Sequence, residues 1–175
     1  ALGAALAERF GGVILSADSR QVYRGMDIGT GKDLADYVRN GKPIPCRLID
    51  IADPCEVYTL YRYLSDFNRA FNEVLSDGKL PVIVGGTGLY VEAALKQYDV
   101  PQAPENEELR ERLMGEPKDV LEKKLLEISP ELYAKTDLSS TKRVVRAIEV
   151  ALSDGAQDLP SRSALNEPLR PLVIG

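Results

Sequence analysis

The sequence has 175 residues, 44% hydrophobic and 28% charged, which excludes a disordered chain and predicts one folded domain with a sizeable core. The 22 lysines and arginines against 27 aspartates and glutamates give a formal net charge of −5, so no overall positive field attracts nucleic acid. No histidine is present, which excludes Ser-His or Cys-His catalysis and metal binding through histidine.

Two cysteines, Cys46 and Cys55, lack the spacing of a metal-binding pair, and we expect both to be free thiols in a reducing cytoplasm. The apolar runs, such as residues 80–84, are too short to cross a bilayer, and no secretory signal pattern is visible. We therefore expect a cytoplasmic protein with no membrane partner, whose chemistry relies on carboxylates, hydroxyls, amides, lysine and arginine.

In chain order, short apolar runs alternate with amphipathic segments. The apolar runs are typical of strands buried in a parallel sheet and lie at 12–16, 46–51, 81–84 and 171–174. The amphipathic segments predict helices over 1–10, 58–75, 89–95, 105–114 and 117–128, and one more that begins at Ser139 or Ser140. This alternation predicts an α/β fold, a parallel sheet flanked by helices. Residues 31–45 and 153–170 are expected to be loops.

Two of these helices have a defined apolar face. In the helix over 58–75, the residues expected to point inward are Tyr61, Leu64, Phe67, Phe71, Val74 and Leu75. In the helix after Ser139 or Ser140, they are Val144, Val145, Ile148 and Leu152.

The polar string over residues 16–23 follows the first predicted strand at its carboxyl end, where open α/β sheets bind ligands. Asp18 can accept a proton from a nucleophile or hold a metal-bound water. Ser19 and Gln21 can hydrogen-bond a base or sugar, and Arg20 can meet a phosphate. The alternative is that Asp18 and Ser19 simply begin a turn.

Two glycine-rich segments invite comparison with phosphate-binding loops. Residues 85–90, Gly-Gly-Thr-Gly-Leu-Tyr, follow a predicted strand and open a helix, so their amides can approach an anion, although a plain tight turn has the same pattern. Residues 29–32, Gly-Thr-Gly-Lys, end like a P-loop. We reject that interpretation because Asp33 replaces the required Ser or Thr and no strand precedes the segment.

Cationic residues gather at the start of the last predicted helix, where Thr141 is followed by Lys142, Arg143 and Arg146. Positive charge at a helix N-terminus opposes the helix dipole and lowers stability unless an anion binds nearby. The alternative is ordinary solvated charge, which is also our interpretation of residues 105–112.

Taken together, five segments resemble the tRNA dimethylallyltransferases, also called tRNA isopentenyltransferases, and they follow the family's order over nearly the whole chain. They are residues 7–12, 16–30, 48–54, 80–90 and 142–150. The resemblance implies a P-loop NTPase-like, nucleotide-binding core. It also implies an enzyme that transfers a dimethylallyl group from dimethylallyl diphosphate to N6 of adenosine 37, in the anticodon loop of tRNA, with the help of Mg²⁺.

The same resemblance implies roles for individual residues. Asp18 matches the general base and, with Ser19, Arg20 and Gln21, the segment that grips the flipped adenine. Thr87 matches a residue beside the reaction channel. The residues expected to contact tRNA elsewhere are Arg110, Thr141, Lys142, Arg143, Val144 and Val145. The chain is expected to be a monomer and a single α/β core over residues 1–175, in which 101–138 form a helical insertion that faces the tRNA.

The sequence also departs from the family pattern. The family's strand, P-loop and Mg²⁺-binding threonine are expected before residue 1, and further basic helices after residue 175, so residues 1–175 alone are expected to be incomplete for activity. Cys46 and Arg47 stand where the family has histidines. Two alternatives stay open: an adenylate isopentenyltransferase that uses a free nucleotide, and a non-catalytic fragment that binds nucleotide or RNA.

Overall fold

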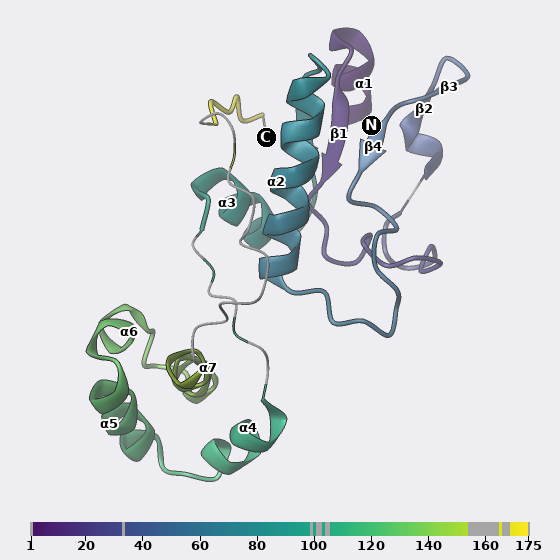
Figure 1. The fold of residues 1–175 in the computed structure, drawn as a ribbon. Helices are drawn as coiled ribbons and strands as arrows, with labels where there is room; N and C mark the ends of the chain where they lie inside the picture. Colours follow the sequence, from purple (N-terminus) through teal and green to yellow (C-terminus); the bar gives the residue numbers. More distant parts are fainter. Residues whose placement is uncertain are drawn as a thin grey trace. The chain divides into compact units, whose positions relative to one another are not determined.

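The computed structural model describes residues 2–32, 34–98, 100, 103, 106–153, 165 and 169–174. The chain forms two compact units (Figure 1). Unit 1 comprises Ala1–Val100 and Ser161–Gly175, and unit 2 comprises Pro101–Pro160. Both described sheets, one of three strands and one of two, belong to unit 1, and the described elements of unit 2 are helices. Each unit has its own apolar core.

The three-stranded sheet of unit 1 confirms the predicted parallel arrangement. Strand β1, Val13–Ser16, lies between β4, Cys46–Arg47, and β5, Pro81–Val84, and both pairings are parallel. All four residues of β1 are buried, as expected for the central strand of a sheet covered on both faces. The carboxyl ends of β1 and β5 therefore lie side by side, since Ser16 is the partner of Val84.

Helices cover both faces of this sheet. On one face, Ala4 and Ala7 of α1, Leu2–Phe10, form a cluster with Ile14 of β1. On the other face, Val13 and Leu15 pack against α2, Leu60–Ser76, and α3, Gly88–Lys96. Because side chains alternate across a strand, the three apolar residues of β1 supply both cores.

The long helix α2 confirms most of the predicted apolar face and corrects one turn of it. Its N-cap residue Thr59 accepts a hydrogen bond from the backbone N–H of Arg62. Tyr63 is fully buried and stacks on Tyr90 with ring centroids 4.0 Å apart, whereas the expected Tyr61 is only half-buried. The buried residues of α2 are Tyr63, Leu64, Phe67, Asn68, Ala70, Phe71 and Val74.

Two predicted strands differ in the structure. The strand expected over 46–51 ends at Arg47, because Leu48 and Asp50 have φ values of 67° and 56°, which no extended strand can contain. Residues 171–174, expected as a fourth strand, have no strand pairing in the structure, and Leu172 is 86% exposed.

The loop predicted over 31–45 contains short elements of regular structure. Residues 31–45 contain the short 3-10 helix η1, Leu34–Tyr37, and the hairpin of β2, Val38–Arg39, with β3, Lys42–Pro43. Most of the predicted loop over 153–170 lies outside the described residues.

Unit 2 contains four described helices around one apolar cluster. They are α4, Glu107–Met114, α5, Lys118–Ile128, α6, Pro130–Lys135, and α7, Thr141–Leu152. Val144, Val145 and Ile148 of α7 pack with Leu121 and Leu125 of α5, so the helical unit extends beyond residue 138. Leu152, expected inside, is 45% exposed. No helix in the described ranges is both long and apolar enough to cross a membrane.

The two cysteines should differ in reactivity. Cys46 is half-buried and Cys55 is exposed. Burial raises the pKa of the Cys46 thiol, Arg47 lowers it and Asp50 raises it again, so the net shift is upward and the thiolate fraction at neutral pH falls. We expect a thiol reagent at neutral pH to modify Cys55 about tenfold faster or more, because the thiolate is the nucleophile.

Mass spectrometry after short labelling times measures both rates. A Cys55→Ser variant should retain only the slow reaction, and that reaction should accelerate as the pH rises. Equal labelling rates at the two thiols would contradict this assignment.

Candidate functional site

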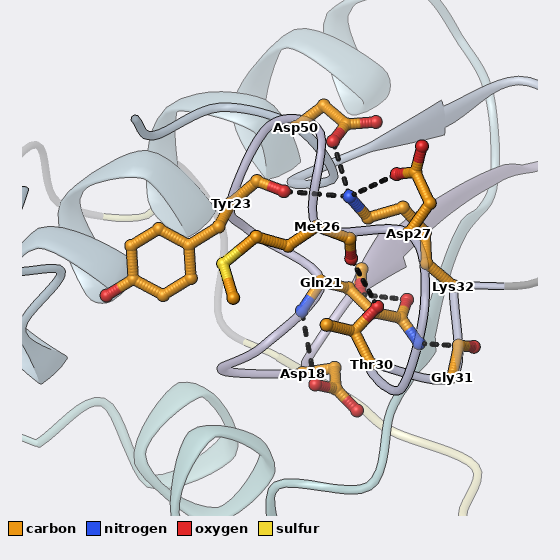
Figure 2. Close-up of polar contacts among 10 residues, drawn as sticks. Asp18, Gln21, Tyr23, Met26, Asp27, Thr30, Gly31, Lys32 and Asp50 are labelled. Carbon is orange, nitrogen blue, oxygen red and sulfur yellow. Dashed lines mark hydrogen bonds and ion pairs between the residues drawn. The ribbon is translucent and has the colours of Figure 1, made fainter. Parts of the chain in front are cut away.

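Asp18 lies in the loop that leaves the carboxyl end of β1, and only 8% of the residue is exposed. Its Oδ1 atom accepts hydrogen bonds from the backbone N–H groups of Arg20 at 2.9 Å and Gln21 at 3.3 Å. Figure 2 shows the second of these bonds. Asp18 thus does form the turn that the sequence allowed as an alternative. The turn uses Oδ1 and leaves Oδ2 with no hydrogen-bond partner among the described residues, so the turn leaves one carboxylate oxygen for the expected proton-accepting role, which stays a prediction.

Thr87 comes from the neighbouring strand end and fastens the same loop. It is the N-cap residue of α3, yet its hydroxyl makes no capping bond. Instead, its Oγ1 atom accepts a hydrogen bond from the Ser19 N–H at 2.9 Å and lies 3.2 Å from Ser19 Oγ. The Thr87 N–H donates to the carbonyl of Ala17 at 3.1 Å. The structure therefore brings Thr87 and the Asp18 loop together at one edge of the sheet, as expected for parallel strands.

Gly85 allows this close approach. A Cβ atom at Gly85 would lie 2.2 Å from the carbonyl oxygen of Ala17, a separation that real Cβ atoms do not show. At Gly86, a Cβ atom would lie 3.6 Å from Oδ2 of Asp18, which places this carboxylate oxygen beside the glycine-rich turn. The turn therefore forms one wall of the site, and its first glycine is required by packing alone.

The three residues after Asp18 differ in how free their side chains are. Ser19 is half-buried and Arg20 is exposed. The Gln21 side chain donates from Nε2 to the carbonyl of Gly31 at 3.1 Å, as Figure 2 shows. Arg20 therefore remains accessible to a phosphate. The Gln21 side chain would have to break its hydrogen bond to Gly31 before its Nε2 atom could contact a base.

Lys32 was not predicted from the sequence as part of the site. Its side chain is fully buried, and Nζ lies 2.6 Å from Oδ1 of Asp50, 2.7 Å from the carbonyl of Tyr23 and 3.1 Å from Oδ1 of Asp27 (Figure 2). Burial alone lowers the pKa of Lys32, but hydrogen bonds and charges from Asp50 and Asp27 outweigh it and raise the pKa. The ion pair between Lys32 and Asp50 was not predicted from the sequence, because Asp50 fell within the strand expected over 46–51.

The remaining candidate residues belong to unit 2. Thr141, Lys142 and Arg143 form the first turn of α7, where the side chains of Lys142 and Arg143 are exposed. Arg143 forms an ion pair with Asp137. Hydrogen bonds from Ser139, together with the charge of Arg143, hold the pKa of Asp137 below its usual value. Asp137 thus supplies part of the negative charge that this helix N-terminus requires.

Three of the residues expected to contact tRNA have their side chains packed or paired within unit 2, and their contact with RNA stays a prediction. Val144 and Val145 are 0% and 2% exposed and pack in the core of unit 2, so their side chains position α7 and have no surface for RNA. The Arg110 guanidinium lies 2.9 Å from the buried carboxylate of Glu149, which also accepts a hydrogen bond from Asn106 and lies 3.4 Å from Arg146. The half-buried side chain of Arg110 is therefore oriented by the buried carboxylate of Glu149.

A family model described as IPP transferase matches residues 21–175. The chain belongs to the IPP transferase family. Among curated relatives, it is 52% identical over 163 residues to tRNA dimethylallyltransferase 1 of Syntrophus aciditrophicus. This match covers 93% of this chain and 53% of the relative. It is also 47% identical over 174 residues to tRNA dimethylallyltransferase 1 of Porphyromonas gingivalis, in a match that covers 99% of this chain and 57% of the relative. The chain thus spans about half the length of these relatives.

Solved structures of this family share the fold. The full-length tRNA isopentenylpyrophosphate transferase of Bacillus halodurans is 35% identical, with a TM-score of 0.52 over 87% of this chain and 50% of that one. A eukaryotic dimethylallyltransferase acting on tRNA is 25% identical, with a TM-score of 0.68 over 88% of this chain and 38% of that one. These matches confirm the P-loop-like α/β fold for this member of the IPP transferase family.

Proposed function

We propose that the full-length protein transfers a dimethylallyl group from dimethylallyl diphosphate to N6 of adenosine 37 in the anticodon loop of tRNA. The observation that carries the proposal is the Asp18 carboxylate, which is held by its own loop through Oδ1 and keeps Oδ2 beside the glycine-rich turn. The names of the relatives, tRNA dimethylallyltransferase, support the same activity. We also propose that the protein is a monomer and is located in the cytoplasm.

The proposed reaction needs one proton acceptor. A bond forms between N6 of the adenine and C1 of the dimethylallyl group, while the bond from C1 to the diphosphate oxygen breaks and diphosphate leaves with the electron pair. The nitrogen gains positive character and loses one proton to Oδ2 of Asp18. The exposed residue Arg20, whose backbone N–H binds this carboxylate, can hold a phosphate of the RNA through its side chain.

Magnesium and the diphosphate-binding P-loop are also parts of the proposal. Within the described ranges, no group of three or more Asp, Glu, Cys or His side chains could hold a metal ion. Asp27 and Asp50 are both engaged by Lys32. We therefore assign no magnesium ligand to the described residues. When bound, Mg²⁺ supplies charge that stabilises the leaving diphosphate.

A comparison of three acceptors in separate reactions tests the proposal. The full-length protein would be incubated with dimethylallyl diphosphate, Mg²⁺ and either tRNA, the same tRNA with guanosine at position 37, or free adenosine monophosphate. We expect prenylated nucleoside, detected by mass spectrometry, only with the first acceptor. Product on the free nucleotide alone would favour an adenylate isopentenyltransferase. Binding of tRNA without any product would favour a non-catalytic RNA-binding protein.

The exposed cations of α7 should contribute to tRNA affinity. For Lys142→Ala with Arg143→Ala in the full-length protein, we expect tRNA binding about tenfold weaker and a salt dependence flatter by about one to two in log–log slope, because phosphate contacts release counterions. The rate at saturating tRNA should fall much less. Binding titrations at several salt concentrations measure both quantities.

The control is Lys123→Ala with Lys124→Ala on α5, which removes the same charge from the same unit. If the control weakened binding as much as the α7 variant, then general charge and not this helix N-terminus would attract the tRNA.

A further inference from the structure

The burial of Lys32 requires an explanation of its own, because an ammonium group is rarely removed from water without full compensation. Its three N–H donors meet three acceptors, the carbonyl of Tyr23 and one carboxylate oxygen each of Asp27 and Asp50. The charge and all three donors of this side chain are therefore satisfied inside the protein.

The three acceptors come from two separate segments. Tyr23 and Asp27 belong to the loop that follows β1, and Asp50 belongs to the segment that follows β4. The same two segments are joined by backbone bonds, from the Asp50 N–H to the carbonyl of Gln21 at 3.1 Å and from the Ile51 N–H to that of Val22 at 2.8 Å. Lys32 thus clamps the loop to the end of a neighbouring strand.

Gln21 connects this clamp to Asp18. Its carbonyl accepts from Asp50, the main ion-pair partner of Lys32, and its side chain donates to Gly31, the residue that precedes Lys32. Its backbone N–H donates to Oδ1 of Asp18 at 3.3 Å. Figure 2 shows Gln21 between the Lys32 cluster and the Asp18 carboxylate.

We propose that Lys32 is a positioning residue for prenyl transfer. Through Asp50, Gly31 and Gln21, it fixes the backbone N–H groups that hold Oδ1 of Asp18, and it thereby aims Oδ2 at the acceptor amine. Lys32 touches neither substrate, and the inference about the reaction rests on the proposed function. Without the ammonium group, Asp27 and Asp50 would lose their shared counter-charge, so the clamp requires a cation and not only a side chain of the right length.

The clamp should be independent of pH over the physiological range. A lysine whose pKa is raised in the folded protein stabilises it at every pH below the pKa of the unfolded chain, and this contribution disappears only as the pH rises through the folded pKa. The groups that face the ammonium are Tyr23, Asp27 and Asp50. The Lys32 cluster is therefore a fixed structural device and not a switch near neutral pH.

The test is Lys32→Met in the full-length protein. We expect the amides of Arg20 and Gln21 to exchange with solvent about tenfold faster or more, because opening the loop exposes them, while the amides of β1 and α2 keep their protection. With saturating tRNA and dimethylallyl diphosphate, the single-turnover rate should fall about ten- to a hundredfold, while the KM for tRNA rises much less, because the loop holds the one proton acceptor but only some of the proposed tRNA contacts.

The matched control is Lys96→Met, which breaks an exposed ion pair with Glu92 on α3 and should leave both readouts unchanged. Asp50→Asn is the milder second variant. Its effects should not add to those of Lys32→Met in the double variant, because both changes break the same contact. This variant also decides the question if Lys32→Met does not fold.

Three results would overturn the inference. They are unchanged exchange at Arg20 and Gln21, an equal loss of protection in β1 and α2, and additive effects of the two substitutions. The exchange measurement does not depend on the reaction, so it separates the two proposals. If the unaltered protein transferred no prenyl group while the local exchange effect was present, the proposed function would fail and the clamp would stand.

Discussion

Asp18→Asn in the full-length protein should lower the single-turnover rate of prenyl transfer by about a hundred- to ten-thousandfold, the usual effect of removing a positioned proton acceptor. The amide oxygen of asparagine can still accept the two backbone hydrogen bonds that Oδ1 of Asp18 now accepts. The turn should therefore persist, and the affinity for tRNA should change little. Only the basic oxygen beside the glycine-rich turn is lost.

Asp18→Ala provides the comparison, because it removes both the proton acceptor and the turn. Its rate should be at least as low as that of Asp18→Asn, and its loop amides should lose protection from hydrogen exchange. Asp53→Asn, which breaks an exposed ion pair with Arg24, serves as the control. Normal turnover of Asp18→Asn at saturating tRNA would show that this carboxylate only forms a turn.

Gly85→Ala should have the largest effect on stability that we predict. The added Cβ atom would lie 2.2 Å from the Ala17 carbonyl oxygen, in backbone that cannot yield without separating β5 from the end of β1. We expect the free energy of unfolding to fall by about 1–3 kcal/mol or more, as for other overpacked sites. Transfer activity should fall as well, since the Asp18 loop rests on this turn. Denaturant unfolding measures the first effect.

Gly88→Ala is the matched control three residues later. A Cβ atom at Gly88 would meet nothing within 4 Å, and Gly88 is the first residue of α3. Because alanine favours helix over glycine by up to about 1 kcal/mol, this variant should be neutral or slightly more stable. Similar destabilisation by both substitutions would mean that the contact at Ala17 is not the cause.

Sequence patterns predicted those parts of the fold that depend on local periodicity. The runs that became β1 and β5 are apolar and short, and α2 has a continuous apolar face, so each was recognisable alone. The strand over 46–51 was predicted too long because its apolar residues gave no sign of the left-handed backbone at Leu48 and Asp50. The short helix α6 was not predicted as a separate helix, because its six residues make fewer than two turns and show no clear helical periodicity.

The candidate site shows the same division. Asp18 and Thr87 each follow a predicted strand of one parallel sheet, whose carboxyl ends lie at one edge, and the structure brings their loops together. The partners of Lys32 and Arg110 could not be predicted, since Asp50 and Glu149 are distant in sequence and meet them only through the fold. For Val144 and Val145, helical periodicity predicted burial correctly, whereas the resemblance suggested a contact with RNA.

The separation of the apolar clusters has a consequence for how this family can diverge. Each cluster of buried residues in the described part of the chain lies wholly within one unit, and unit 2 interrupts unit 1 between Val100 and Ser161. The core residues of helices α4–α7 can therefore exchange for one another during evolution without repacking the core around β1 and β5. Sequence drift in the helical unit and constancy at the sheet edge are the expected signature among relatives, because the two cores do not share a side chain.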